Sequence, residues 1–262
     1  MGCNTTIISS VSEYVSFFES LPEGVCYRGV SNKGYALIPS VGRIADGVSK
    51  NAVLCKEYKA FCLFQREYAL ICSGLSPMDV AINAQHHGVP TRLLDWTLNP
   101  LVALFFAIKS NFENDACVYI FDSIAIPHSN NVNYNMFLMS LDGQLTKRFY
   151  KKNNGTPAPC DHIRYFEWFQ KNIEYECVAV TPCAVNRRVS LQSGIFTVQT
   201  DPFKDVVSKF ILHKVIIPAS SKHALLHQLS KINIHEYSLF GDADNLAKWV
   251  ARTHFSGVLN GV

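Results

Sequence analysis

The sequence of 262 residues lacks a long apolar run and a strong excess of charge. No apolar run approaches the ~18 residues expected of a membrane-spanning helix, so the stretch LVALFFAI (101–108) predicts a buried helix instead. Charged residues make up 17% of the chain, below the roughly 25% of an average globular domain, and the formal net charge is only +3. This balance is too small to predict a nucleic-acid partner by itself, and no membrane partner is expected.

Cysteine is present but lacks a ligand pattern. None of the nine cysteines forms a C-x-x-C pair, and no short cluster of Cys and His has zinc-ligand spacing, so no metal site is predicted. Most of the cysteines lie in apolar stretches such as AFCLF (60–64), where cysteine packs as a small hydrophobe. Because their number is odd and no signal peptide is recognised, we expect free thiols, no disulfide and a cytoplasmic protein.

What the sequence does contain is a mixture of helical and extended patterns. Apolar spacing and cap residues predict helices near 11–21, 52–72, 78–86, 99–112, 221–232 and 242–253. Strand patterns lie at 25–30, 91–96, 116–122, 175–182, 193–199 and 212–218. Their irregular order favours an α+β domain over a doubly wound sheet. We expect residues 35–43 to be extended as far as Pro39, and residues 129–159 to form an exposed loop or insertion.

The stretch AQHHGVPTRLLDWT (84–97) is unusually dense in polar and special residues, and it directly precedes the apolar run. It predicts a helix end, a tight turn shaped by Gly88 and Pro90, a strand, and a new helix with Asn99 as its N-cap. Such a junction suits one wall of a nucleotide cleft, since helix starts favour anions. The adjacent His86 and His87 point in different directions on a helix and do not predict a metal site.

Three separated stretches together resemble the FRG domain, a bacterial family named after a Phe/Tyr-Arg-Gly triplet. Here the triplet is Tyr27-Arg28-Gly29, the central motif is residues 84–97, and the late segment is RRVSLQSGIFTV (187–198). The closing stretch 235–250 also fits, although Gly241 stands where the family tends to have Pro. The resemblance covers about 19–250, and we therefore expect one FRG domain over 1–262.

FRG domains in turn resemble ADP-ribosyltransferases, which cleave NAD at its glycosidic bond. The resemblance implies a split antiparallel β-sheet core with flanking helices and NAD as co-substrate. Arg28 matches the Arg of the first strand of the Arg-Ser-Glu class, and Thr97 could occupy the position of the Ser or Thr. Gln192 stands where that class has its catalytic Glu. The expected catalytic set is therefore Arg28, Asp95, Thr97 and Gln192, lining one cleft.

Each of these residues has a structural alternative beside its functional one. Arg28 and Arg92 could hold a phosphate through the planar guanidinium fork, and Asp95 could polarise a ribose hydroxyl. Alternatively, Arg28 could close a turn or pair with Asp95, and Arg92 could pair with Asp95. Gln192 could instead be a core amide satisfied by the backbone. The expected cofactor site also includes four neighbours, of which Tyr35 or Trp96 could stack on a base and Asn99 begins a helix that could face a phosphate: Gly29, Tyr35, Trp96 and Asn99.

Two functions are consistent with this sequence. The first is an NAD-dependent ADP-ribosyltransferase-like enzyme, or NAD glycohydrolase, that modifies an unidentified protein or nucleic acid as a bacterial toxin or anti-phage effector. The second is a non-catalytic module that binds a nucleotide or nucleic acid in the same cleft. The Gln at position 192 favours the second function, and the combination of Arg28 with a polar strand end favours the first.

Overall fold

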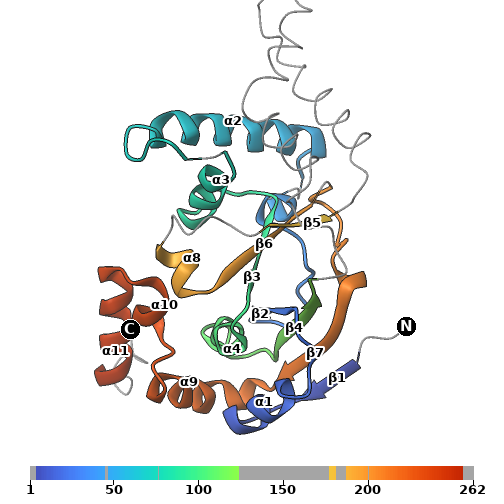
Figure 1. The fold of residues 1–262 in the computed structure, drawn as a ribbon, viewed down its shortest axis with the longest axis vertical. Helices are drawn as coiled ribbons and strands as arrows, with labels where there is room; N and C mark the ends of the chain where they lie inside the picture. The colour runs from blue at the N-terminus through green and yellow to red at the C-terminus, as the bar shows by residue number, and fades with distance from the viewer. Residues whose placement is uncertain are drawn as a thin grey trace, which may run out of the picture.

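The computed structural model describes residues 4–44, 47–75, 77–123, 177–180, 187–199 and 201–255. Over these residues the protein is a mixed α+β fold, as predicted, with a seven-stranded open sheet and helices packed around it (Figure 1). The predicted loop at 129–159 lies outside the described residues.

The sheet has the strand order β1-β7-β4-β2-β3-β6-β5 and is mostly antiparallel. The exception is the parallel pair of β1 with β7. The strands are β1 (Asn4–Ile7), β2 (Val25–Val30), β3 (Leu93–Thr97), β4 (Ala116–Asp122), β5 (Cys177–Val180), β6 (Gly194–Gln199) and β7 (Ile211–Ile217). Of these, β1 is the strand that the sequence patterns did not predict, because its four polar and apolar residues NTTI carry no clear alternation.

The middle of the sheet is held together weakly between β2 and β3. These strands pair at a single position, Tyr27 with Thr97, whereas β2 pairs with β4 at six positions and β3 with β6 at five. The strands therefore part beyond Tyr27 and Thr97. A space opens at the centre of the sheet, and the side chains beside it come from the two sequence motifs.

Eight α-helices are described, and they divide between the two halves of the sheet (Figure 1). In the picture α1, α4 and α9 lie along the β1-β7-β4-β2 half, while α2 and α3 lie beside the β3-β6-β5 half. Their bounds are α1 (Val11–Phe18), α2 (Lys50–Tyr68), α3 (Pro77–His86), α4 (Pro100–Ile108), α8 (Arg187–Leu191), α9 (Lys222–Lys231), α10 (Glu236–Phe240) and α11 (Ala243–Phe255). Three short 3-10 helices lie at η1 (Ser40–Ile44), η2 (Ser208–Phe210) and η3 (Ala219–Ser221).

Helix α4 packs closely on β2, and the sequence explains why. Asn99 caps the helix through hydrogen bonds from Leu101 N and Val102 N, with Pro100 at the first position, as predicted. Almost the whole helix is buried, in one core cluster with Tyr27, Val118 and Ile120. A Cβ atom at Gly29 would lie 1.9 Å from the carbonyl oxygen of Ala103. The Gly of the triplet is thus required by the helix that packs over it.

The predicted stop at Pro39 agrees with the structure: η1 begins at the next residue, Ser40, whose hydroxyl bonds the backbone of Thr91. One sequence prediction is wrong in detail. The long helix predicted at 52–72 lies at Lys50–Tyr68, since Ser49 provides the N-cap two residues earlier. Among the described cysteines, those at positions 26, 62 and 72 carry free thiols.

Candidate functional site

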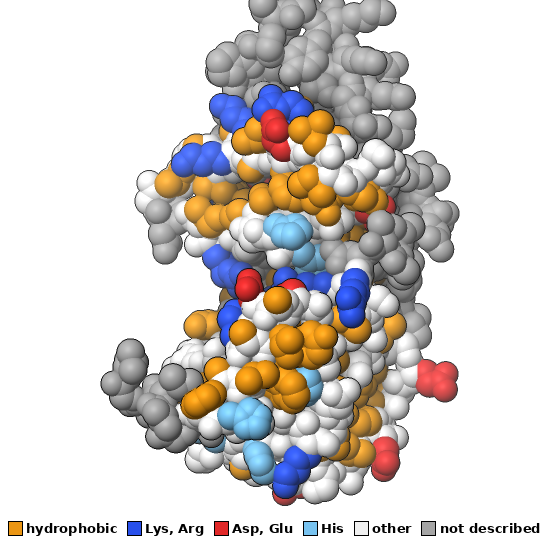
Figure 2. All heavy atoms as spheres, turned by 90° about the vertical axis from the view of Figure 1, so that its left-hand side faces the viewer, with side chains coloured by type: hydrophobic (Ala, Val, Ile, Leu, Met, Phe, Trp, Pro, Cys, Tyr) orange, Lys and Arg blue, Asp and Glu red, His pale blue; other side chains and the backbone are white. Residues whose placement is uncertain are grey.

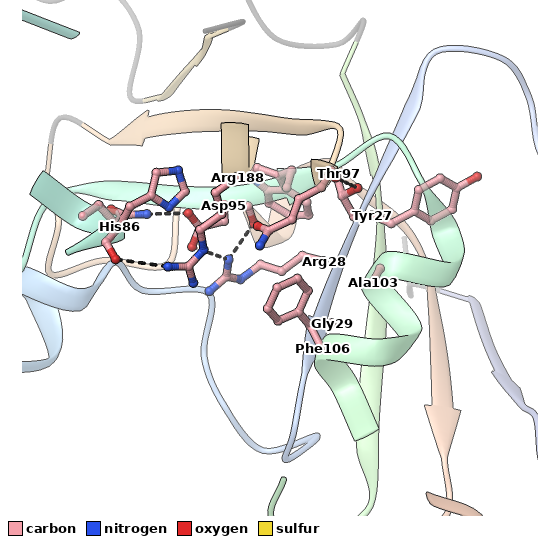
Figure 3. A pocket seen from close by; sticks show the side chains of 12 residues that line it. Tyr27, Arg28, Gly29, His86, Asp95, Thr97, Ala103, Phe106 and Arg188 are labelled. Carbon is pink, nitrogen blue, oxygen red and sulfur yellow. Dashed lines mark hydrogen bonds and ion pairs between the residues drawn. The ribbon is translucent and has the colours of Figure 1, made fainter. Parts of the chain in front are cut away.

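A cavity of about 200 Å³ lies where β2 and β3 part (Figure 3). The structure brings Arg28, Asp95 and Gln192 together in its wall, although they are far apart in the sequence. Gly29, Trp96 and Thr97 also line it. The remaining lining residues were not among the predicted site residues: Tyr27, Gln85, His86, Ala103, Phe106 and Arg188.

Arg28 occupies the space between the two strands. Its Nη1 donates a hydrogen bond of 2.6 Å to the backbone oxygen of Asp95, replacing the strand pairing that β2 and β3 do not make there. The same Nη1 lies 3.6 Å from the Asp95 carboxylate, and the Arg28 side chain is only 15% exposed. Its Nε is buried and has no hydrogen-bond partner among the described residues. Burial lowers the pKa of Arg28, Asp95 opposes that shift, and the guanidinium remains charged at neutral pH.

Asp95 provides the carboxylate of the cavity. Its side chain is 56% exposed, so it can meet a ligand from solvent. Gln85 Nε2 donates to Asp95 Oδ1 at 2.5 Å, and Gln85 in turn accepts a hydrogen bond from the Thr91 hydroxyl. The carboxylate is thereby oriented by an amide on one side and by Arg28 on the other. Such an oriented, accessible carboxylate can polarise a hydroxyl or accept a proton.

His86 and Arg188 complete the polar wall. Arg188 Nη1 donates to the backbone oxygen of His86 at 3.2 Å, and Figure 3 shows Arg188 turned toward Asp95 from the side opposite to Phe106. Burial and the positive charge of Arg188 lower the pKa of His86 to about 4, so its ring is neutral at neutral pH. His86 Nε2 is buried, and no described residue forms a hydrogen bond with it. The cavity therefore contains two cations, one carboxylate and one neutral imidazole.

Thr97 and Gln192 have structural contacts that the sequence did not reveal. The Thr97 hydroxyl donates to the backbone oxygen of Gln192 at 2.6 Å and accepts from Asn99 N at 3.0 Å. The Gln192 Nε2 donates to the backbone oxygen of Leu239 at 3.1 Å. Both side chains thus join the end of β3 to α8 and α10. Gln192 is engaged as an amide held by the backbone, which is one of the alternatives expected from the sequence.

Three predicted cofactor-site residues do not line the cavity, namely Tyr35, Arg92 and Asn99. Arg92 forms a bidentate pair with Glu57, at 2.9 and 2.6 Å, rather than with Asp95; the two side chains are 3% and 12% exposed. Asn99 uses its carboxamide oxygen to cap α4, and the N-terminal end of this helix does not line the cavity. The geometry of these residues serves the fold.

Trp96 lies at the cavity, but its ring does not face a ligand. The ring is buried, stacks on Phe121 with centroids 4.5 Å apart, and donates from Nε1 to the Thr197 hydroxyl at 3.0 Å. The aromatic ring available to a ligand is instead that of Phe106, which lines the cavity from α4. No signal in the sequence distinguishes Phe106 from its equally apolar neighbours in the same helix.

Three residues that were missed as site residues did carry a signal in the sequence. Gln85 and His86 stand inside the central motif, where His86 was considered only as a metal ligand, and Arg188 lies in the late segment.

Among the described residues no group of three or more His, Cys, Asp or Glu side chains could hold a metal ion. The described helices include none that is long and apolar enough to cross a membrane.

The fold and the site define an α+β protein with a polar cavity at the centre of its sheet. The family model of the FRG domain matches residues 23–116, which span β2 through the first residue of β4 and include both the triplet and the central motif. Residues 23–116 are therefore an FRG domain, and that resemblance is confirmed. No curated protein and no solved structure matches the chain.

Proposed function

We propose that the cavity binds NAD or a closely related nucleotide, and that the protein is an ADP-ribosyltransferase-like enzyme. The observation that carries the proposal is a pair of buried nitrogens in one cavity, Arg28 Nε and His86 Nε2, that find no hydrogen-bond partner in the part of the chain that the structure describes. A buried polar atom without a hydrogen bond costs about 1–3 kcal/mol, more if charged. A ligand oxygen at each nitrogen would remove that cost. Arg28 and Arg188 favour a phosphate there.

The chemistry of the proposal assigns the central step to Asp95. Cleavage breaks the bond between ribose C1 and the nicotinamide nitrogen, and nicotinamide leaves with the electron pair. The ribose then carries positive charge, as in glycoside hydrolysis. An acceptor oxygen or nitrogen, or water, attacks C1 and gives up its proton. Asp95 stabilises the positive ribose and accepts that proton. Among the described residues that line the cavity, it is the one carboxylate.

The sheet supports the same proposal. An ADP-ribosyltransferase-like fold is expected to have a split antiparallel sheet, and the single pair joining β2 to β3 agrees with such a division. The wider setting, transfer to a macromolecule by a bacterial toxin or anti-phage effector in the cytoplasm, is supported by the family resemblance alone.

A second candidate function is nucleotide binding without cleavage. The observation that favours it is Gln192, whose amide is held by Leu239 O and lacks the negative charge of the expected Glu. In this alternative Arg28, Arg188 and His86 bind the nucleotide as they do in the first, and Asp95 orients a ribose hydroxyl without promoting cleavage.

Incubation of the purified full chain with NAD, with nicotinamide release followed by chromatography, tests the proposal. Release is expected for the wild type and a loss of at least about tenfold for Asp95→Asn, which keeps the shape but cannot accept a proton in the same way. Asp115→Asn, at a half-buried carboxylate outside the cavity that pairs with Lys33 and accepts a hydrogen bond from Ala219 N, is the matched control. NAD binding without release would support the second candidate, and absence of both would refute the first.

A further inference from the structure

A second group of cations lies next to the cavity, on the surface formed by the end of α4 and by α8 and α11. Figure 2 shows Lys and Arg side chains gathered in a band across the middle of this face. We name the surface formed by Lys109, Arg187, Arg188 and Lys248 the basic shelf. Arg188 belongs to both the cavity wall and the shelf, so the two are continuous.

Aromatic rings hold the shelf in place. Arg188 Cζ lies 4.3 Å from the centroid of the Phe240 ring, and Lys109 Nζ lies 5.1 Å from the same centroid. Lys109 Nζ is also 4.7 Å from the centroid of the cavity residue Phe106. Two cations therefore share one ring, and a third contact runs directly back to the cavity. Such cation–π contacts position the charges without neutralising them.

The positive charge of the shelf is only partly balanced. In the described part of the chain, no carboxylate lies within salt-bridge distance of Lys109, Arg187 or Lys248. Glu236 is nearby but forms a bidentate pair with Arg252, and Asp242 is bonded by Asn245 while it also attracts Arg188 and Lys248. Burial and the charges of Arg188 and Lys248 lower the pKa of Lys109. Asp242 thus attracts Arg188 and Lys248, Asp95 of the cavity also attracts Arg188, and Glu236 attracts Lys109, so these carboxylates offset the charge of the shelf only in part.

The cavity is too small to hold a whole dinucleotide, so part of such a ligand would lie on the surface beside it. A cavity of about 200 Å³ is smaller than the roughly 300–1,000 Å³ of most small-molecule sites. A ligand with a nucleoside in the cavity must therefore extend beyond it, and the shelf is the adjoining surface on the side of Phe106 and Arg188.

We propose that the basic shelf binds a phosphate group outside the cavity, so that the ligand of the whole site carries phosphate beyond the part held by Arg28. The phosphate could come from a dinucleotide seated in the cavity or from a nucleic-acid strand that passes over it, and the chemistry of recognition is the same. The inference deepens the proposed function but does not need cleavage of NAD.

The experiment measures binding to the full chain by calorimetry, at two salt concentrations, with inorganic diphosphate, ADP-ribose and a short single-stranded DNA as probes. The variants are Lys109→Gln with Lys248→Gln, and as matched control Lys56→Gln with Lys59→Gln, two exposed lysines of α2. We expect each shelf substitution to weaken the shelf ligand about two- to fivefold, more at low salt, and the control to bind as the wild type does.

Lys109 ends α4 and could act only on that helix, so Lys109→Arg is a second variant. It keeps the charge, and we expect it to restore binding. A loss confined to ADP-ribose identifies the dinucleotide as the source of the phosphate, and a loss confined to DNA, with a shallower salt dependence, identifies the strand. Equal binding by shelf and control variants for all three probes would overturn the inference, whether or not nicotinamide is released by the wild type. Release without shelf binding keeps the proposed function, and shelf binding without release keeps only the inference.

Discussion

Replacing Arg28 by Met should weaken the fold and the ligand site together, and the structure allows the two effects to be estimated. The change removes the 2.6 Å hydrogen bond from Nη1 to Asp95 O, and a hydrogen bond from a charged donor contributes about 1.5–3 kcal/mol. The ion pair with the Asp95 carboxylate adds no more than about 1 kcal/mol, because that carboxylate is 56% exposed. Met fills much of the same space and avoids the cost of burying a charge.

The expected result is a decrease of about 1–3 kcal/mol in the free energy of unfolding, measured by urea titration with tryptophan fluorescence. Arg66→Met, at an exposed arginine of α2 that pairs with its neighbour Glu67, is the control and should change that free energy by less than about 0.5 kcal/mol. Arg28→Lys should recover part of the stability, since Lys keeps the charge but not the planar fork. Nucleotide binding is measured on the same protein preparations without urea, at a temperature at which all variants are folded.

Two outcomes would refute parts of this reasoning. If Arg28→Met unfolds with the free energy of the wild type, Arg28 does not hold β3 to β2. If the variant is less stable but the folded protein binds nucleotide with unchanged affinity, Arg28 is a structural residue and Nε does not meet a ligand.

The remaining predictions concern the packing, a buried pair and a titration. Gly29→Ala would put a Cβ atom 1.9 Å from Ala103 O and 2.6 Å from Ala107 N, both of which are backbone atoms that cannot move aside. We expect the free energy of unfolding to fall by at least about 1–3 kcal/mol. Gly34→Ala, whose Cβ would meet only the side chain of Asn32 at 3.2 Å, is the milder control in thermal unfolding. Glu57→Gln leaves Arg92 buried without its charge partner, so unfolding should require about 3–5 kcal/mol less; a change below about 1 kcal/mol would show that the pair contributes little. His86 has a pKa of about 4 in the folded protein and 6.5 when exposed, so the unfolded chain binds more protons between these values and stability should fall as the pH is lowered through this window. His86→Gln should flatten that slope in pH-dependent urea titrations, and an unchanged slope would show that another group is responsible.

The elements of this fold were predictable from the sequence where the signal is local. Asn99 and Pro100 mark the start of α4, and the alternation in ACVYIFD marks β4, because capping and side-chain periodicity depend on neighbours in the chain. The order in which the strands lie side by side in the sheet was not predictable, since β1 pairs with β7 across more than 200 residues. The ends of α2 were misjudged because the apolar spacing continues past the last hydrogen-bonded turn.

The candidate site shows the same division. The two motifs and the late segment led to Arg28, Asp95 and Gln192, which do lie around one cavity. The partner of Arg92 could not be read from the sequence, because Glu57 stands on another helix 35 positions away and nothing in its surroundings marks it. Nor could the direction of the Trp96 ring be read, since it follows from which face of β3 meets the core.

The narrow join between β2 and β3 also bears on how the chain can be divided. With β1, β7, β4 and β2 in one half of the sheet and β3, β6 and β5 in the other, the chain passes between the halves four times, from β2 to β3, β3 to β4, β4 to β5 and β6 to β7. A fragment of residues 23–116 would keep the family signature but would end at the first residue of β4 and would lack β6, so β2 and β3 would lose the strands with which they pair at six and five positions. Its two unpaired strand edges would favour aggregation. The stretch that identifies the family is thus shorter than the unit that can be expressed and studied in isolation.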